Sequence, residues 1–138
     1  MNNAAPVTVE VGITVGLRGM LGGPVPVPTE LRYDPTDPYA VTATFHHGQG
    51  EIDWIFARDL LADGLLAPTG DGDLHINPVV DSDTVLLVLT TLDGAAVMEA
   101  SAEELAAFLD LSYDQVPPGT EWDHVDFDAE LAKLAMRD

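Results

Sequence analysis

The feature that most restricts the fold is a long alternating run near the start of the chain. Over residues 7–17, Val, Ile or Leu occupies every second position, and Thr, Glu or Gly stands between them. Successive side chains of a strand point to opposite faces, so this pattern predicts a strand with one buried face. Gly12 and Gly16 on the other face indicate strong curvature or the close approach of another backbone. We therefore expect a curved, barrel-like sheet.

Residues 25–65 predict further strands followed by one short helix. Asp-Pro pairs at positions 34–35 and 37–38 predict a tight bend, because Asp bonds its own backbone and Pro fixes φ at about −65°. Gly64 suits the left-handed position at which many helices end. The expected elements are strands over residues 25–33, 39–46 and 52–56, a hairpin loop at 47–50, and a helix over 57–63.

Residues 84–90 form a continuous apolar run rather than an alternating one. Both faces of such a strand are expected to be covered. The C-terminal helices or another subunit could cover the second face, and a subunit contact agrees with an oligomer. Candidates for that interface are Val85, Leu87 and Leu89.

Turn and capping signals define the rest of the chain. A turn at residues 69–73 precedes a short strand over 74–78, and Asp93-Gly94 predicts a hairpin returning as residues 95–99. Ser101 and Glu104 form a capping box, which starts a helix. A last helix is expected over residues 126–137. The prediction is one α+β domain over residues 1–138, with a curved antiparallel sheet, a short inserted helix and two C-terminal helices.

Composition excludes several functions. The chain has 24 acidic and five basic residues, a net charge of −19, which opposes nucleic-acid phosphates and anionic membrane surfaces. It has no cysteine, so disulfides and thiolate metal sites are excluded. No apolar run approaches the roughly 18 residues that span a bilayer. We expect a cytoplasmic protein without direct membrane insertion, metal or cofactor.

No arrangement of residues indicates catalysis. Ser82, Ser101 and Ser112 stand in no nucleophile motif. His46 and His47 are neighbours on a predicted strand, so their side chains point to opposite faces and cannot share a metal. An enzyme is not expected.

A few scarce side chains are the candidates for binding. Arg32 and Arg58 are each flanked by an aromatic residue and an aspartate, and their simplest role is an intramolecular ion pair or hydrogen-bond hub that ties the bend to the short helix. Their functional alternative is to anchor an interface. Trp54 belongs either to the core or to an exposed anchor. Met20 and Leu21 at a predicted loop tip are either tucked under the sheet or presented to a partner.

The chain resembles the SsgA-like sporulation and cell-division proteins of filamentous actinobacteria, and it is closest to their SsgB type. The resemblance covers roughly residues 25–134. It is carried by the residues that stand at 31–34, 37–41, 54–61, 64–65, 68–73, 116–121, 127–128 and 130–131. The signature positions that could also bind a partner are Arg32, Tyr33, Asp37, Tyr39, Trp54, Arg58 and Asp59.

The resemblance implies a non-enzymatic regulator that recruits the tubulin-like division protein FtsZ to septum sites, with an SsgA-type partner upstream. It also implies a homotrimer similar in architecture to Whirly proteins, which bind single-stranded nucleic acid. That likeness supplies the alternative function, a single-stranded nucleic-acid binder, which would need a basic groove and exposed aromatic side chains. Five basic residues against 24 acids disfavour it.

Overall fold

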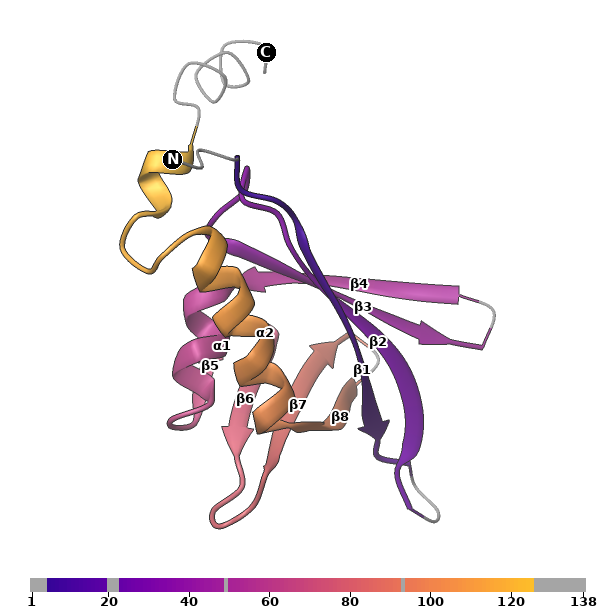
Figure 1. Ribbon diagram of the computed structural model, residues 1–138. Helices are drawn as coiled ribbons and strands as arrows, with labels where there is room; N and C mark the ends of the chain where they lie inside the picture. Colours follow the sequence, from indigo (N-terminus) through magenta and orange to yellow (C-terminus); the bar gives the residue numbers. More distant parts are fainter. Residues whose placement is uncertain (1–4, 20–22, 49, 93, 126–138) are drawn as a thin grey trace.

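The computed structural model describes residues 5–19, 23–48, 50–92 and 94–125 (Figure 1). Met20, Leu21 and the helix expected over residues 126–137 lie outside the described residues. The described chain forms one antiparallel sheet of eight strands in the order β4-β3-β2-β1-β8-β7-β6-β5. The strands are β1 (Val9–Leu17), β2 (Val25–Tyr33), β3 (Ala40–His47), β4 (Gly50–Ala57), β5 (Thr69–Asp71), β6 (Leu74–Pro78), β7 (Thr84–Thr91) and β8 (Gly94–Ser101).

The sheet has two halves of four consecutive strands, and each half is followed by a helix. Helix α1 (Arg58–Gly64) follows β4 and helix α2 (Ala102–Gln115) follows β8, with a short 3-10 helix η1 (Glu121–His124) after it. The halves join where Gly16 pairs with Glu99 and Leu17 pairs with Met98. The sheet curls into a half-barrel, with both helices on its inner side (Figure 1). This confirms the curved antiparallel α+β fold and the inserted helix.

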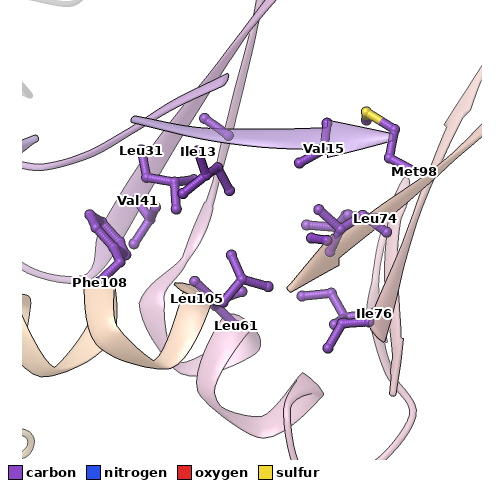
Figure 2. Packing of buried hydrophobic residues seen from close by; sticks show 14 of the residues in the cluster. Ile13, Val15, Leu31, Val41, Leu61, Leu74, Ile76, Met98, Leu105 and Phe108 are labelled. Carbon is purple, nitrogen blue, oxygen red and sulfur yellow. The ribbon is translucent and has the colours of Figure 1, made fainter. Parts of the chain in front are cut away.

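The core fills the inner side of the half-barrel. Alternate residues of the strands are buried there, beginning with Ile13 and Val15 on β1. Leu61 of α1 and Leu105 and Phe108 of α2 point toward the same cluster, so the helices cover this part of the sheet (Figure 2). Burying each of these large apolar side chains contributes about 1.5–3 kcal/mol.

Strand β7 corrects the expectation of a subunit contact through Val85, Leu87 and Leu89. These side chains point inward and are only 0%, 9% and 5% exposed, because the core of the same chain covers them. Val85 and Leu87 are therefore not available to a second subunit, whereas Leu89 also borders an open hollow. Leu86 and Val88 on the outer face are half-buried.

Two glycines are explained by close contacts. Gly64 is the last residue of α1 and is not in the left-handed conformation, so the expected role as a C′ residue is wrong. A Cβ at Gly64 would lie 2.5 Å from the Cβ of Ile76 on β6, so only glycine lets α1 pack this closely. At Gly16 a Cβ would lie 2.8 Å from the Cβ of Pro24, so the close neighbour is a side chain rather than the backbone that was expected. At Gly12 no described atom lies within 4 Å of such a Cβ.

The start of α2 is capped from two sides. Ser101 Oγ accepts a hydrogen bond from the Glu104 amide at 3.2 Å, which confirms the predicted serine cap. Asp83, on the loop before β7, accepts the Glu103 amide at 2.9 Å and the Ser101 hydroxyl at 2.6 Å. These hydrogen bonds lower the pKa of the Asp83 carboxyl.

Strand β5 differs from prediction, because residues 69–71 pair with β6 instead of forming a turn.

Candidate functional site

The side chain of Arg58 lies at the centre of the most connected polar cluster that the described residues form. Arg58 begins α1, directly after β4, and its side chain is only 1% exposed. Its guanidinium lies 4.7 Å from the ring centroid of Tyr33 on β2 and 4.8 Å from that of Tyr113 on α2. The guanidinium therefore makes cation–π contacts with both rings. Such contacts are more favourable in a desolvated site than at the surface.

The guanidinium is also held by oxygens from the end of α2 and the segment after it. Arg58 Nη2 lies 2.9 Å from Glu121 Oε2, a buried ion pair. Nη1 donates to the carbonyl oxygen of Val116 at 2.8 Å and to that of Ser112 at 3.3 Å. We call Arg58, Tyr33, Tyr113, Ser112, Val116 and Glu121 the arginine hub.

The Asp-Pro bend is fixed to the arginine hub through the backbone. The Tyr33 hydroxyl donates to the Pro38 carbonyl at 2.8 Å, and the Arg58 amide donates to the Tyr39 carbonyl at 2.8 Å. Asp34 closes the bend by accepting the amide and the hydroxyl of Thr36, which lowers the pKa of its carboxyl. These hydrogen bonds fix the start of α1 relative to the bend.

The protonation states of the hub suit a structural role. Burial raises the pKa of the Tyr33 hydroxyl to about 12, against the opposing effect of Arg58, and burial likewise raises the pKa of Tyr113. Burial alone would raise the pKa of the Glu121 carboxyl, but hydrogen bonds from Arg58 and the Gly119 amide outweigh it and lower that pKa. At neutral pH the tyrosines are therefore neutral and Glu121 is ionised, so none of these groups is ready to exchange a proton.

The hub confirms the predicted structural role of Arg58 and extends it. The sequence indicated that Arg58 ties the bend to the short helix, and it did not identify Tyr113, Ser112 or Glu121 as partners. Glu121 is 63 residues away from Arg58, so its pairing could not be read from local patterns. A buried arginine needs an acidic partner, but the sequence offers 24 acidic residues and does not indicate which one.

The other signature residues are not brought into the hub. Asp37, Tyr39 and Asp59 lie on the outside of the bend and the first turn of α1, where all three are exposed, Tyr39 to 47%. We call these three residues the bend surface. Arg32 lies on the outer face of the sheet, where its Nε is 3.6 Å from Glu10 Oε1, so it forms an intramolecular ion pair but does not tie the bend to the short helix.

Trp54 lies in a different region, on the inner face of β4. Its side chain is half-buried against the core and also lines an open hollow of about 420 Å³ between β4 and β7. It is thus neither a fully buried core residue nor a free surface anchor. The hollow is lined by Leu17, Val27, Phe45, His47, Ile52, Trp54, Leu89, Thr91, Ala96 and Met98.

The described residues contain no arrangement typical of a metal site or a basic groove. No group of three or more His, Asp or Glu side chains among them could hold a metal ion. Arg18 pairs with Glu99 at 2.8 Å, Arg32 lies near Glu10 and Arg58 is buried, so the described arginines do not form a surface for nucleic-acid phosphates. The alternative of single-stranded nucleic-acid binding is therefore not supported. No described helix has the length and apolar character needed to span a membrane.

Sequence comparison places the chain beside one group of proteins. The model of the family described as Streptomyces sporulation and cell division protein, SsgA, matches residues 27–121. The sporulation-specific cell division protein SsgB of Saccharopolyspora erythraea is 53% identical over 116 residues, covering 83% of this chain and 82% of the relative. The SsgB protein of Streptomyces coelicolor is 49% identical over 113 residues, covering 80% and 82%.

Solved structures agree with the sequence matches. The SsgA-like sporulation-specific cell division protein of Thermobifida fusca superposes with a TM-score of 0.84 at 35% identity, covering 96% of this chain and 99% of that one. A structure reported with SsgB mutations that correlate to longitudinal cell division during sporulation of Streptomyces coelicolor gives 0.81 at 42% identity, covering 89% and 99%. The likeness to Whirly proteins stays a prediction.

Proposed function

The chain belongs to the SsgA family of sporulation and cell division proteins, and we propose that it is a non-enzymatic regulator that recruits FtsZ to septum sites. The observation that carries the proposal is the similarity to SsgB proteins, which are sporulation-specific cell division proteins, over most of the chain. The geometry supports a binding role, because Nη1 and Nη2 of Arg58, at the centre of the most connected polar cluster, are bonded to groups of the chain itself and only Nε lacks a partner.

The bend surface is the proposed contact for a protein partner. Its backbone is held from below by the arginine hub, so Asp37, Tyr39 and Asp59 are presented in a fixed arrangement. Preorganised surfaces lose less conformational entropy on binding, and tyrosine is among the residue types that carry most binding energy at interfaces. The net charge of −19 favours a partner whose contact surface is basic.

The proposal includes further partners and a location. An SsgA-type protein would act upstream, and the chain would assemble as a homotrimer through surfaces other than the inner face of β7. Its place would be the cytoplasm at division septa. Light scattering of the purified protein tests the trimer, since a mass of one subunit at micromolar concentration would contradict it.

A localisation experiment tests the function itself. A fluorescent fusion would be expressed in a sporulating actinobacterium whose own SsgB gene is deleted, together with labelled FtsZ. The proposal predicts fusion signal at future septa, with FtsZ rings restored at the same places. A folded fusion that stays diffuse while FtsZ rings fail to form would contradict it. The Tyr39→Ala variant should retain its fold and lose the restoration, whereas Ile55→Ala on the outer face of β4 should behave as the unmodified chain.

A further inference from the structure

The hollow beside Trp54 is an apolar cavity that neither helix covers. Its volume of about 420 Å³ lies within the roughly 300–1,000 Å³ typical of small-molecule sites, which are often found at the mouths of β-barrels. Leu89 and Met98 on its walls are only 5% and 4% exposed, so the hollow reaches the depth of the core. Phe45, Trp54 and Leu89 also line a small internal void of about 20 Å³, so these side chains form a wall common to the two cavities.

The lining of the hollow selects an uncharged occupant. The chain carries 24 acidic residues, yet no acid and no arginine or lysine is among the residues that line it. Its polar side chains are those of His47 and Thr91. An ionised group placed here would lose its hydration without a partner of opposite charge, and the net charge of −19 adds repulsion for anions.

The same lining favours an aliphatic chain over a peptide segment. A peptide that entered the hollow would bury N–H and C=O groups that need hydrogen-bond partners, and the lining side chains that could bond them are few, chiefly His47 and Thr91. An aliphatic chain needs none, and it gains the transfer free energy of every methylene that leaves water. Only the head group of such a molecule requires a polar contact, and His47 lies on the wall where it could provide one.

We propose that the hollow between β4 and β7 binds the aliphatic chain of a small uncharged amphiphile, with its hydroxyl-bearing head group at His47. This goes beyond the recruitment of FtsZ and does not depend on it. Strand β4 provides an internal comparison, because Ile52 lines the hollow whereas Ile55 on the same strand lies on the outer face.

Tryptophan fluorescence tests the proposal. The chain has two tryptophans, so the full-length Trp122→Phe variant leaves Trp54 as the single reporter on the wall of the hollow. The probe is monooctanoylglycerol, titrated below its critical micelle concentration. We expect a saturable blue shift of the Trp54 emission, because the octanoyl chain of the probe displaces water from the indole. Octanoate, an anion, and octyltrimethylammonium, a cation, also have eight-carbon chains. Both should bind more weakly than the uncharged monooctanoylglycerol.

Matched variants locate the site. Ile52→Asp puts a carboxylate at the mouth and should weaken binding about tenfold or more, whereas Ile55→Asp on the outer face should leave it unchanged. Ala96→Phe fills the hollow and should abolish the shift, with circular dichroism as the check of folding. No saturable shift, or equal weakening by the two aspartate variants, would overturn the proposal. A rise in the molecular mass of the protein that accompanies the emission shift would also overturn the proposal, because a second copy of the chain would then fill the hollow.

Discussion

Arg58 Nη2 and Glu121 Oε2 lie 2.9 Å apart, although the two side chains are only 1% and 8% exposed. Arg58 begins α1 and Glu121 begins η1, so their contact fixes the segment after α2 against the first half of the sheet. The Asp-Pro bend is fixed from the same point, through the carbonyl of Tyr39. Through its guanidinium and its backbone amide, Arg58 therefore sets the relative positions of three segments that are distant in the sequence.

Replacing one partner of this ion pair should lower the free energy of unfolding more than its net contribution to stability would suggest, because the other charge stays buried and unpaired. The single variants Arg58→Met and Glu121→Met each leave an unpaired buried charge, and each should lower the free energy of unfolding by about 3–5 kcal/mol. The double variant leaves neither charge, so its loss should be smaller than the sum of the single losses. Urea denaturation measures all three. Additive losses would show that the two side chains do not interact.

The ion pair also predicts how stability depends on pH. The Glu121 carboxyl has its pKa lowered in the folded protein from the ordinary value of 4.5. Its contribution is therefore fully present above about pH 4.5 and is lost as the pH falls through the lower folded pKa. Glu121→Gln should remove this part of the slope in a series of melting temperatures from about pH 6 to pH 3. The same slope in both proteins would contradict the assignment of Glu121.

Gly64 should not tolerate a side chain. In Gly64→Ala the new Cβ would lie 2.5 Å from Ile76 Cβ, and relieving that overlap should cost about 1–3 kcal/mol. Gly12→Ala is the matched control, because no described atom lies within 4 Å of its Cβ, and its effect should be small. Thermal unfolding measures both. Adding Ile76→Gly removes the clashing Cβ, so Gly64→Ala should cost less in that background.

The serine cap of α2 predicts a modest loss. Ser101→Ala removes the oxygen that accepts the Glu104 amide, and it should destabilise the domain by about 0.5–2 kcal/mol. Ser101→Asn retains a capping oxygen and should lose less. Denaturation curves of the two variants decide this, and equal losses would show that the cap contributes little.

Local patterns predicted most of the strands, because alternation and turn residues are signals that do not depend on distant partners. Residues 7–17 and the hairpin after residue 91 were predicted close to their observed positions. Gly64 was interpreted as a helix-ending residue, since its contact with Ile76 arises only when β6 packs against α1. β7 was assigned to an interface for the same reason, because the sequence shows that Val85 is buried and does not show what buries it.

The candidate site was predictable only in part. Arg58 and Tyr33 were named from their local context, and the structure brings them together. Glu121 and Tyr113 were missed because their approach depends on the path of the chain after α2. The bend surface and the hollow are separate regions, and the sequence signature placed members of both, Tyr39 and Trp54, in one group.

Co-sedimentation with FtsZ polymers tests the central proposal most directly. Purified protein would be spun with polymerised FtsZ, with and without a single-stranded oligonucleotide, and Tyr39→Ala would serve as the bend-surface variant. The proposal predicts saturable pelleting that the oligonucleotide does not reduce and that Tyr39→Ala weakens. A folded protein that stays in the supernatant at tens of micromolar, with FtsZ polymers fully pelleted, would contradict direct recruitment.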